Sequence, residues 1–137
     1  MAKRNLARQW ARTTKTDLDD YDGQCLELAN DVGRWLDDKG MTNDLVYIES
    51  PKESTLVAHY PSGDQRWYYH AVILSGRLIH DGWLEEALPK RQYFAQVFPG
   101  QRVRVEYRSK DGEIALVEVW RGGRLLLRKM RNRTEEP

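Results

Sequence analysis

One cysteine and three histidines are the residues of this chain best suited to carry chemistry. The cysteine is Cys25, and the histidines are His59, His70 and His80. A cysteine becomes a nucleophile when its thiolate forms near neutral pH and a base lies beside it. As the single cysteine of the sequence, Cys25 has no partner for an internal disulfide, which is typical of a reducing compartment. We therefore consider its surroundings first.

The segment around Cys25 has the pattern of an amphipathic helix. From Asp22 to Asp38, apolar residues recur at helical spacing and share one face: Cys25, Leu28, Ala29, Val32, Trp35 and Leu36. Asp22 is the predicted N-cap, and Gly40 is the predicted C-cap. Cys25 then lies in the first turn, where backbone N–H groups and the helix dipole favour a thiolate. The alternative is that Cys25 is only a small apolar residue on the buried face of the helix. The nearby charges of Asp20 and Asp22 would also oppose a thiolate.

His70 and Asp81 lie on the two sides of a predicted β-hairpin. With Ser75-Gly76 as its loop, the register that we favour, His70 lies directly opposite Asp81, and cross-strand Cβ atoms are about 4.5–5.5 Å apart. With Gly76-Arg77 as the loop, the two residues are diagonal neighbours on one face. A three-residue loop would place them on opposite faces. The first two registers predict an imidazole oriented by a carboxylate, as a thiol hydrolase requires.

The other histidines are alternatives to His70. In the favoured register His80 points away from Asp81, as a packed or surface histidine would, and His59 has no obvious carboxylate partner. A metal site built from Cys25 and the three histidines is a further alternative, but no two of them have a short ligand spacing. We expect no metal and no cofactor.

These motifs resemble the core of the papain-like fold, whose relatives include transglutaminase-like proteins and NlpC-like cell-wall peptidases. The resemblance lies in the Gly-Gln-Cys step from Gly23 to Cys25, which opens the helix, and in the later hairpin from His70 to Gly82. It covers roughly residues 20 to 85. It implies a thiol-dependent hydrolase or acyltransferase acting on an amide or thioester, with Cys25 as nucleophile, His70 as general base and acid, and Asp81 as the orienting residue.

Further site residues follow from this resemblance. Gln24 or Tyr21 is the candidate oxyanion donor, with the backbone N–H of Cys25 as the second donor. Leu26 stands where the family often has a tryptophan beside the cysteine.

Several aromatic residues lie near the proposed site in the sequence: Trp67, Tyr68, Tyr69, Trp83 and Tyr93. Trp67, Tyr69 and Trp83 are the candidate substrate-binding residues, on the wall of an acyl or peptide groove. Packing in the core or on the sheet is the alternative interpretation of these side chains, since aromatic residues most often do this.

The remaining pattern predicts an α+β fold. A short helix is expected near Leu6 and Trp10, β-strands at 45–49 and 55–60, and helical pieces at 84–88 and 89–98. A C-terminal β-meander follows at about 101–130, with turns at Asp111-Gly112 and Gly122-Gly123. We predict one domain over residues 1–137, with N-terminal helices packed on an antiparallel sheet.

The composition limits the partners. No apolar run approaches the roughly 18 residues of a membrane helix, and no secretory h-region is visible, so we expect a cytoplasmic protein without membrane contact. A net charge of +1 gives no overall attraction to nucleic acid. A peptide, a protein or a small acyl compound is the expected substrate. A catalytically silent papain-like binding or regulatory module is the alternative function, and binding of single-stranded nucleic acid by the basic ends is a third.

Overall fold

The computed structural model describes residues 4–51, 54–109, 112–130 and 133–135. Its helices are α1 (Leu6–Thr14), the 3-10 helix η1 (Leu18–Tyr21), α2 (Cys25–Asp38) and α3 (Lys90–Val97). Its strands are β1 (Asp44–Glu49), β2 (Leu56–Tyr60), β3 (Gly63–Trp67), β4 (Tyr69–Ser75), β5 (Leu78–His80), β6 (Arg102–Arg108), β7 (Ile114–Arg121), β8 (Arg124–Met130) and β9 (Arg133–Glu135). None of the helices in these ranges is both long and apolar enough to cross a bilayer.

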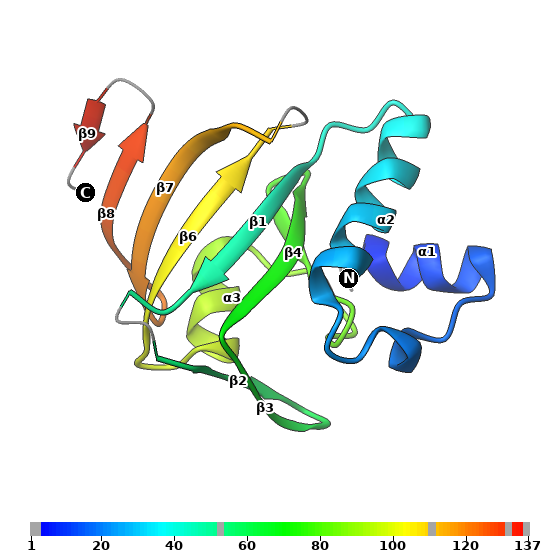
Figure 1. The fold of residues 1–137 in the computed structure, drawn as a ribbon, viewed down its shortest axis with the longest axis horizontal. Helices are drawn as coiled ribbons and strands as arrows, with labels where there is room; N and C mark the ends of the chain where they lie inside the picture. Colours follow the sequence, from blue (N-terminus) through cyan, green and yellow to red (C-terminus); the bar gives the residue numbers. More distant parts are fainter. Residues whose placement is uncertain (1–3, 52–53, 110–111, 131–132, 136–137) are drawn as a thin grey trace.

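Seven strands form one sheet in the order β5-β4-β1-β6-β7-β8-β9, and β2 and β3 form a separate hairpin. Every strand pair in the described residues is antiparallel. The chain therefore has the predicted α+β fold, and β6, β7 and β8 make the predicted C-terminal meander. Figure 1 shows α1 and α2 beside the β4 end of the sheet.

Two hydrophobic cores lie on the two faces of the sheet. Strand β4 contributes to both, because successive side chains of a strand point to opposite faces. Ala71 and Ile73 pack against α1 and α2, while Val72 packs in the larger core with α3 and the β2–β3 hairpin. Burial of each large apolar side chain contributes roughly 1.5–3 kcal/mol. The two cores hold α2 and the hairpin against β4, the strand that carries His70.

The N-cap of helix α2 lies two residues after the predicted one. Asp22 ends η1 instead, and Gln24 is the N-cap of α2 without a capping hydrogen bond from its side chain. Gly23, at φ +77°, turns the chain between the two helices, so Cys25 becomes the first residue of α2. At the other end Gly40 follows the cap residue at φ +72°, and its N–H donates to the carbonyl of Asp37, as predicted for a glycine that ends a helix.

The β4–β5 hairpin has the second of the two registers that keep His70 and Asp81 on one face. Ser75 pairs with Leu78, so Gly76 and Arg77 form the loop, at φ +61° and +65°. The favoured register was wrong because a two-residue loop with positive φ at both positions matches the twist of the strands. Gly76 adopts that conformation readily, and Arg77 follows it.

Residues 84–88 are not helical, contrary to the prediction. The backbone N–H of Leu84 donates to the carbonyl of Asp81, closing a turn, and Leu88 exchanges two hydrogen bonds with Ile79 at 2.7 and 3.1 Å. The segment thus adds a short bridge to β5, and Pro89 is the N-cap of α3 and not its first residue. The predicted Gly122-Gly123 turn joins β7 to β8, whereas Asp111 of the other predicted turn lies outside the described residues.

Candidate active site

His70 and Asp81 form a buried pair. The Nε2 atom of His70 lies 3.0 Å from Oδ2 of Asp81, and each residue is only 1% exposed. His70 is the second residue of β4, and Asp81 follows the last residue of β5. The structure thus brings the predicted histidine and aspartate together, although through the diagonal register.

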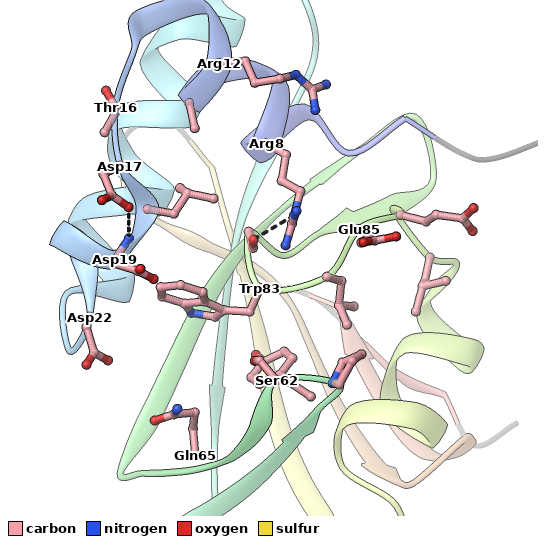
Figure 2. Close-up of a pocket in the computed structure, with 18 of the residues that line it drawn as sticks. Arg8, Arg12, Thr16, Asp17, Asp19, Asp22, Ser62, Gln65, Trp83 and Glu85 are labelled. Carbon is pink, nitrogen blue, oxygen red and sulfur yellow. Dashed lines mark hydrogen bonds between the residues drawn. The ribbon is translucent and has the colours of Figure 1, made fainter.

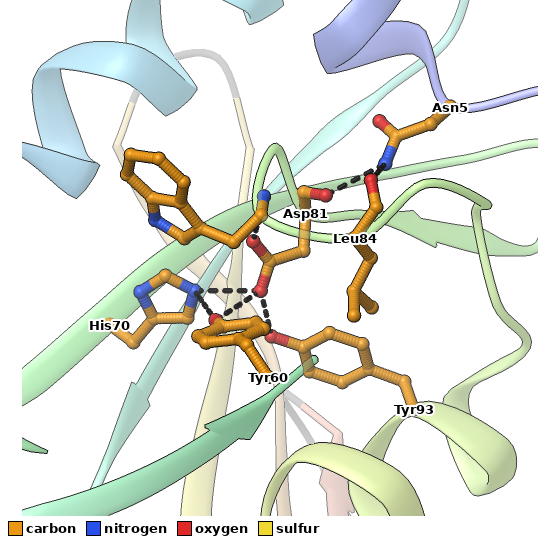
Figure 3. Close-up of polar contacts among 7 residues, drawn as sticks. Asn5, Tyr60, His70, Asp81, Leu84 and Tyr93 are labelled. Atoms are coloured by element: carbon orange, nitrogen blue, oxygen red, sulfur yellow. Dashed lines mark hydrogen bonds and ion pairs between the residues drawn. The ribbon is translucent and has the colours of Figure 1, made fainter. Parts of the chain in front are cut away.

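Asp81 has three further hydrogen-bond donors that the sequence did not predict. The hydroxyls of Tyr60 and Tyr93 donate to Oδ2 at 2.5 and 2.7 Å, and the backbone N–H of Trp83 donates to Oδ1 at 3.0 Å. Figure 3 shows both phenol rings converging on the carboxylate from different elements. In the sequence Tyr93 was only one aromatic residue among several near the site, and nothing indicated a role for Tyr60. Their roles depend on how β2 and α3 pack.

These contacts keep Asp81 ionised. Burial alone would raise the pKa of the carboxyl, but the charge of His70 and the hydrogen bonds from His70, Tyr60 and Tyr93 outweigh it and lower the pKa. Burial and the charge of Asp81 raise the pKa of Tyr60 and of Tyr93 well above 10, so both phenols stay protonated and act as donors.

His70 is set up to hold a proton. Burial would lower its pKa, but the charge of Asp81 dominates, Cys25 adds to it, and the pKa rises to about 9. Because Nε2 faces Asp81, a neutral imidazole carries its proton there and leaves the lone pair on Nδ1. Nδ1 is buried and accepts no hydrogen bond from a nitrogen or oxygen atom of the described residues. Trp67 stacks on the ring at 4.3 Å between centroids and fixes its plane.

Cys25 is half-buried at the start of α2, where His70 acts on its thiol. Burial would raise the pKa of the thiol, but His70 lowers it, and so do the backbone N–H groups of Ala71 and Leu26, with the net result that the pKa is lowered. Asp20 and Asp22, which the sequence placed close to the thiol, both have exposed side chains. The arrangement therefore supplies a thiol, a base and a carboxylate that orients the base.

The two candidate oxyanion side chains lie differently. The hydroxyl of Tyr21 donates to Oδ2 of Asp31 at 2.5 Å, and its ring packs edge-on against Trp10. The Tyr21 hydroxyl is thus bonded to a side chain of α2 and does not point to Cys25 as an oxyanion donor would. Gln24 is exposed beside Cys25 and does not cap the helix. The Leu26 N–H, which the sequence did not single out, is a backbone donor near the sulfur.

The candidate substrate-binding aromatics separate into three roles. Trp67 supports the His70 ring from one side and contacts Tyr60 edge-on. Tyr69 stacks on Tyr47 of the neighbouring strand at 5.0 Å, as a sheet aromatic would. Trp83 is half-buried and lines two cavities, so of the three it is the residue best placed to meet a substrate.

A cleft of about 1420 Å³ lies beside the site. Its walls come from α1 and η1, the β2–β3 hairpin, residues 82–88 and α3, and Figure 2 shows Trp83 on its wall between Asp19 and Ser62. Gly82 and Trp83 also line a cavity of about 10 Å³ that borders Cys25, His70 and Asp81. Gly82 and Trp83 are thus the residues that the cleft and the small cavity at the candidate site share.

The other two histidines have separate partners. Nδ1 of His80 accepts a hydrogen bond from the Leu6 N–H, and its Nε2 donates to the carbonyl of Ser75, both at 3.0 Å. Burial lowers the pKa of His80, so it is a packed, neutral residue that holds the start of α1. His59 does have a carboxylate partner, contrary to the prediction, because the β2–β3 register places it opposite Asp64. Its Nδ1 atom lies 2.9 Å from Oδ1 of Asp64.

The described residues hold no group of three or more His, Cys, Asp or Glu side chains arranged to bind a metal ion. No protein-family model, curated protein or solved structure matches the chain. The function is therefore argued from the geometry of Cys25, His70 and Asp81 and from the general chemistry of such sets.

Proposed function

We propose that the protein is a thiol-dependent hydrolase or acyltransferase that acts on an amide or a thioester. The observation that carries this proposal is the buried His70–Asp81 pair whose free Nδ1 belongs to the ring beside Cys25. Such a ring takes the proton of a thiol and keeps it, since Asp81 stabilises the imidazolium. The papain-like resemblance of the motifs implies the same roles for the three residues.

The first half-reaction forms an acyl-enzyme. The Cys25 thiolate attacks the carbonyl carbon of the substrate, and a carbon–sulfur bond to Cys25 forms. The bond from that carbon to the leaving nitrogen or sulfur breaks, and the leaving group takes the proton from Nδ1 of His70. The Leu26 N–H, a backbone donor to the Cys25 sulfur at the N-terminus of α2, is a candidate donor to the developing oxyanion beside the Cys25 N–H.

The second half-reaction regenerates the thiol. Water, or an acceptor amine or thiol in a transferase, gives a proton to Nδ1 of His70 and attacks the acyl carbon. The bond to Cys25 breaks, the product leaves with the new carbon–oxygen, carbon–nitrogen or carbon–sulfur bond, and the Cys25–His70 pair returns to its starting state. A substrate would approach from the cleft past Trp83.

Alkylation of Cys25 by iodoacetamide at pH 6 tests the proposal. An ordinary cysteine with a pKa near roughly 8.5 is almost wholly protonated at that pH, whereas Cys25 should react faster than a free thiol. His70→Ala should slow the reaction about 100-fold, since the thiol returns to its ordinary range. His80→Ala is the matched control and should leave the rate unchanged. An inert Cys25 in the folded protein would end the hydrolase proposal.

A catalytically silent binding module is the second candidate function, and one observation favours it. The cavity that borders Cys25, His70 and Asp81 measures about 10 Å³, the space of roughly one water molecule. A binding module would keep the fold and the cleft but would not turn over amides or thioesters. Rapid alkylation of Cys25 without hydrolysis of any thioester would support this second function.

A further inference from the structure

We propose that Tyr60 and Tyr93 are positioning residues that hold Asp81 as an anion aimed at His70, and so control whether Cys25 and His70 exist as an ion pair. The inference deepens the proposed function and rests on it for its catalytic meaning. Neither residue touches a substrate in this proposal. Both act through the carboxylate.

The convergence on one oxygen atom is the first observation. Oδ2 of Asp81 accepts from Tyr60, Tyr93 and Nε2 of His70, at 2.5, 2.7 and 3.0 Å. The three donors come from β2, α3 and β4, so three separate elements meet there. Oδ1 accepts only the backbone N–H of Trp83 in the described residues. The carboxylate is thus held on both oxygens, and its rotation is blocked.

Burial makes these hydroxyls energetically important. Asp81 is 1% exposed, so water does not solvate its charge, and a buried carboxylate needs a full set of donors. The titratable groups that face it are His70 from β4, Tyr60 from β2 and Tyr93 from α3, and Cys25 from α2 lines the same small cavity. His70 is the one cation of this set. The two phenols therefore supply stabilisation that a second cation would otherwise provide.

The geometry also ranks the two tyrosines. The Tyr60 oxygen lies 3.2 Å from Nε2 of His70 as well as 2.5 Å from Oδ2 of Asp81, so it contacts both members of the pair. Of this pair, the Tyr93 hydroxyl contacts the Asp81 carboxylate, at 2.7 Å. Loss of the Tyr60 hydroxyl should therefore disturb imidazole orientation as well as carboxylate charge, and Tyr60→Phe should have the larger effect on the thiol.

The consequence for Cys25 follows from the charge of Asp81. Without a hydroxyl donor, the buried carboxyl takes up a proton at a higher pH. Once neutral, it no longer holds the proton on His70 against the cost of burying an imidazolium. That proton then passes from Nδ1 back to the Cys25 sulfur, and the reactive ion pair becomes the neutral pair. The acid limit of thiol reactivity should move upward.

The test compares Tyr60→Phe, Tyr93→Phe and the double variant with Tyr107→Phe. Tyr107 is the matched control, because its hydroxyl also donates at 2.5 Å to a buried carboxylate, that of Glu118, which lies outside the set around Cys25. The Asp81 pKa is followed through its ¹³C carboxyl shift in the folded proteins. Each of the first two variants should raise that pKa by about one unit, the double variant by more, and Tyr107→Phe not at all.

The second measurement is the pH dependence of Cys25 alkylation in the same proteins. Its acid limit should rise in the order Tyr93→Phe, Tyr60→Phe, double variant, and stay fixed in Tyr107→Phe. A uniform loss of rate with an unmoved limit would show a structural role only and would overturn the inference. An unchanged Asp81 pKa would overturn it as well. A shifted Asp81 pKa with an inert Cys25 would keep the positioning role and reject the hydrolase function.

Discussion

Two buried carboxylates in this protein have similar surroundings but differ in the chemistry that they can support. Glu118 on β7 is fully buried and accepts from Tyr107 at 2.5 Å and from the Trp120 indole at 3.1 Å, much as Asp81 accepts from its tyrosines. The difference lies in the cations. Glu118 is paired with Arg128 at 2.9 Å and Lys90 at 3.4 Å, whereas among the described residues Asp81 is paired with His70 alone.

The choice of cation decides what each centre can do. Arginine and lysine side chains keep their charge throughout the neutral range, so the Glu118 centre has one protonation state there. Burial would raise the pKa of Glu118, but the Tyr107 hydrogen bond and the charge of Lys90 lower it. An imidazolium can give up its proton, and a neighbouring thiolate can accept it. A buried carboxylate is thus structural or chemical according to its partner.

Removal of the two carboxylates should separate these roles and gives the largest expected effect on stability. Glu118→Gln leaves Arg128 and Lys90 without their counter-charge and should cost about 3 kcal/mol of unfolding free energy. Asp81→Asn should cost less, about 1–2 kcal/mol, because His70 can become neutral. Denaturant unfolding of both variants measures the difference.

Alkylation of Cys25 should show the opposite order in the same two variants. Glu118→Gln should leave the rate at pH 6 unchanged, and Asp81→Asn should lower it. If Asp81→Asn proved the more destabilising variant and alkylation survived in it, the assignment of chemistry to the Asp81 centre would be wrong.

The pH dependence of stability should show whether Cys25 and His70 share one proton. The folded pKa of His70, about 9, lies above the ordinary value of 6.5, so its stabilisation is complete below pH 6.5 and is lost as the pH rises through 9. The lowered pKa of Cys25 acts in the opposite sense, since its contribution is lost as the pH falls. Between about pH 6.5 and 8.5 the folded ion pair and the unfolded neutral pair each bind one proton. The wild-type protein should therefore show a flat profile there.

Cys25→Ser removes one side of this balance. Folded His70, whose pKa Asp81 still raises, then binds a proton that the unfolded chain releases, so stability should fall as the pH rises above 6.5. The loss should be on the order of 2 kcal/mol or less, because Cys25 no longer adds to the raised pKa of His70. Thermal unfolding across this range measures the slope. A sloping wild-type profile, or a flat profile in Cys25→Ser, would show that the two residues do not share a proton.

The sequence predicted the parts of this site that depend on local pattern. Helical spacing located α2 and placed Cys25 in its first turn, and the apolar runs around Gly76 placed His70 and Asp81 on one hairpin. Alternation of apolar residues likewise found the meander. These predictions succeed because the periods of helix and strand are written in neighbouring residues.

The features that the sequence missed depend on tertiary packing. The turn chemistry of Gly76-Arg77 changed the register, and the bridge between Ile79 and Leu88 replaced an expected helix. The donors of Asp81 come from Tyr60 and Tyr93, which lie 21 and 12 residues away along the chain. No local pattern encodes that convergence, since buried tyrosines pack for many reasons.

Lys90→Met should give the smallest effect and sharpens the account of the Glu118 centre. The Lys90 Nζ atom lies 3.4 Å from Oε1, a longer contact than the Arg128 contact at 2.9 Å, and its side chain is 24% exposed. It also lies 4.2 Å from the centre of the Tyr107 ring. Methionine keeps the apolar stem over that ring and removes the charge, and Glu118 retains Arg128, Tyr107 and Trp120 as donors. We expect a loss of about 0.5–1 kcal/mol in denaturant unfolding and an unchanged rate of Cys25 alkylation. A loss as large as that of Glu118→Gln would mean that Lys90, and not Arg128, is the main counter-charge of the buried glutamate.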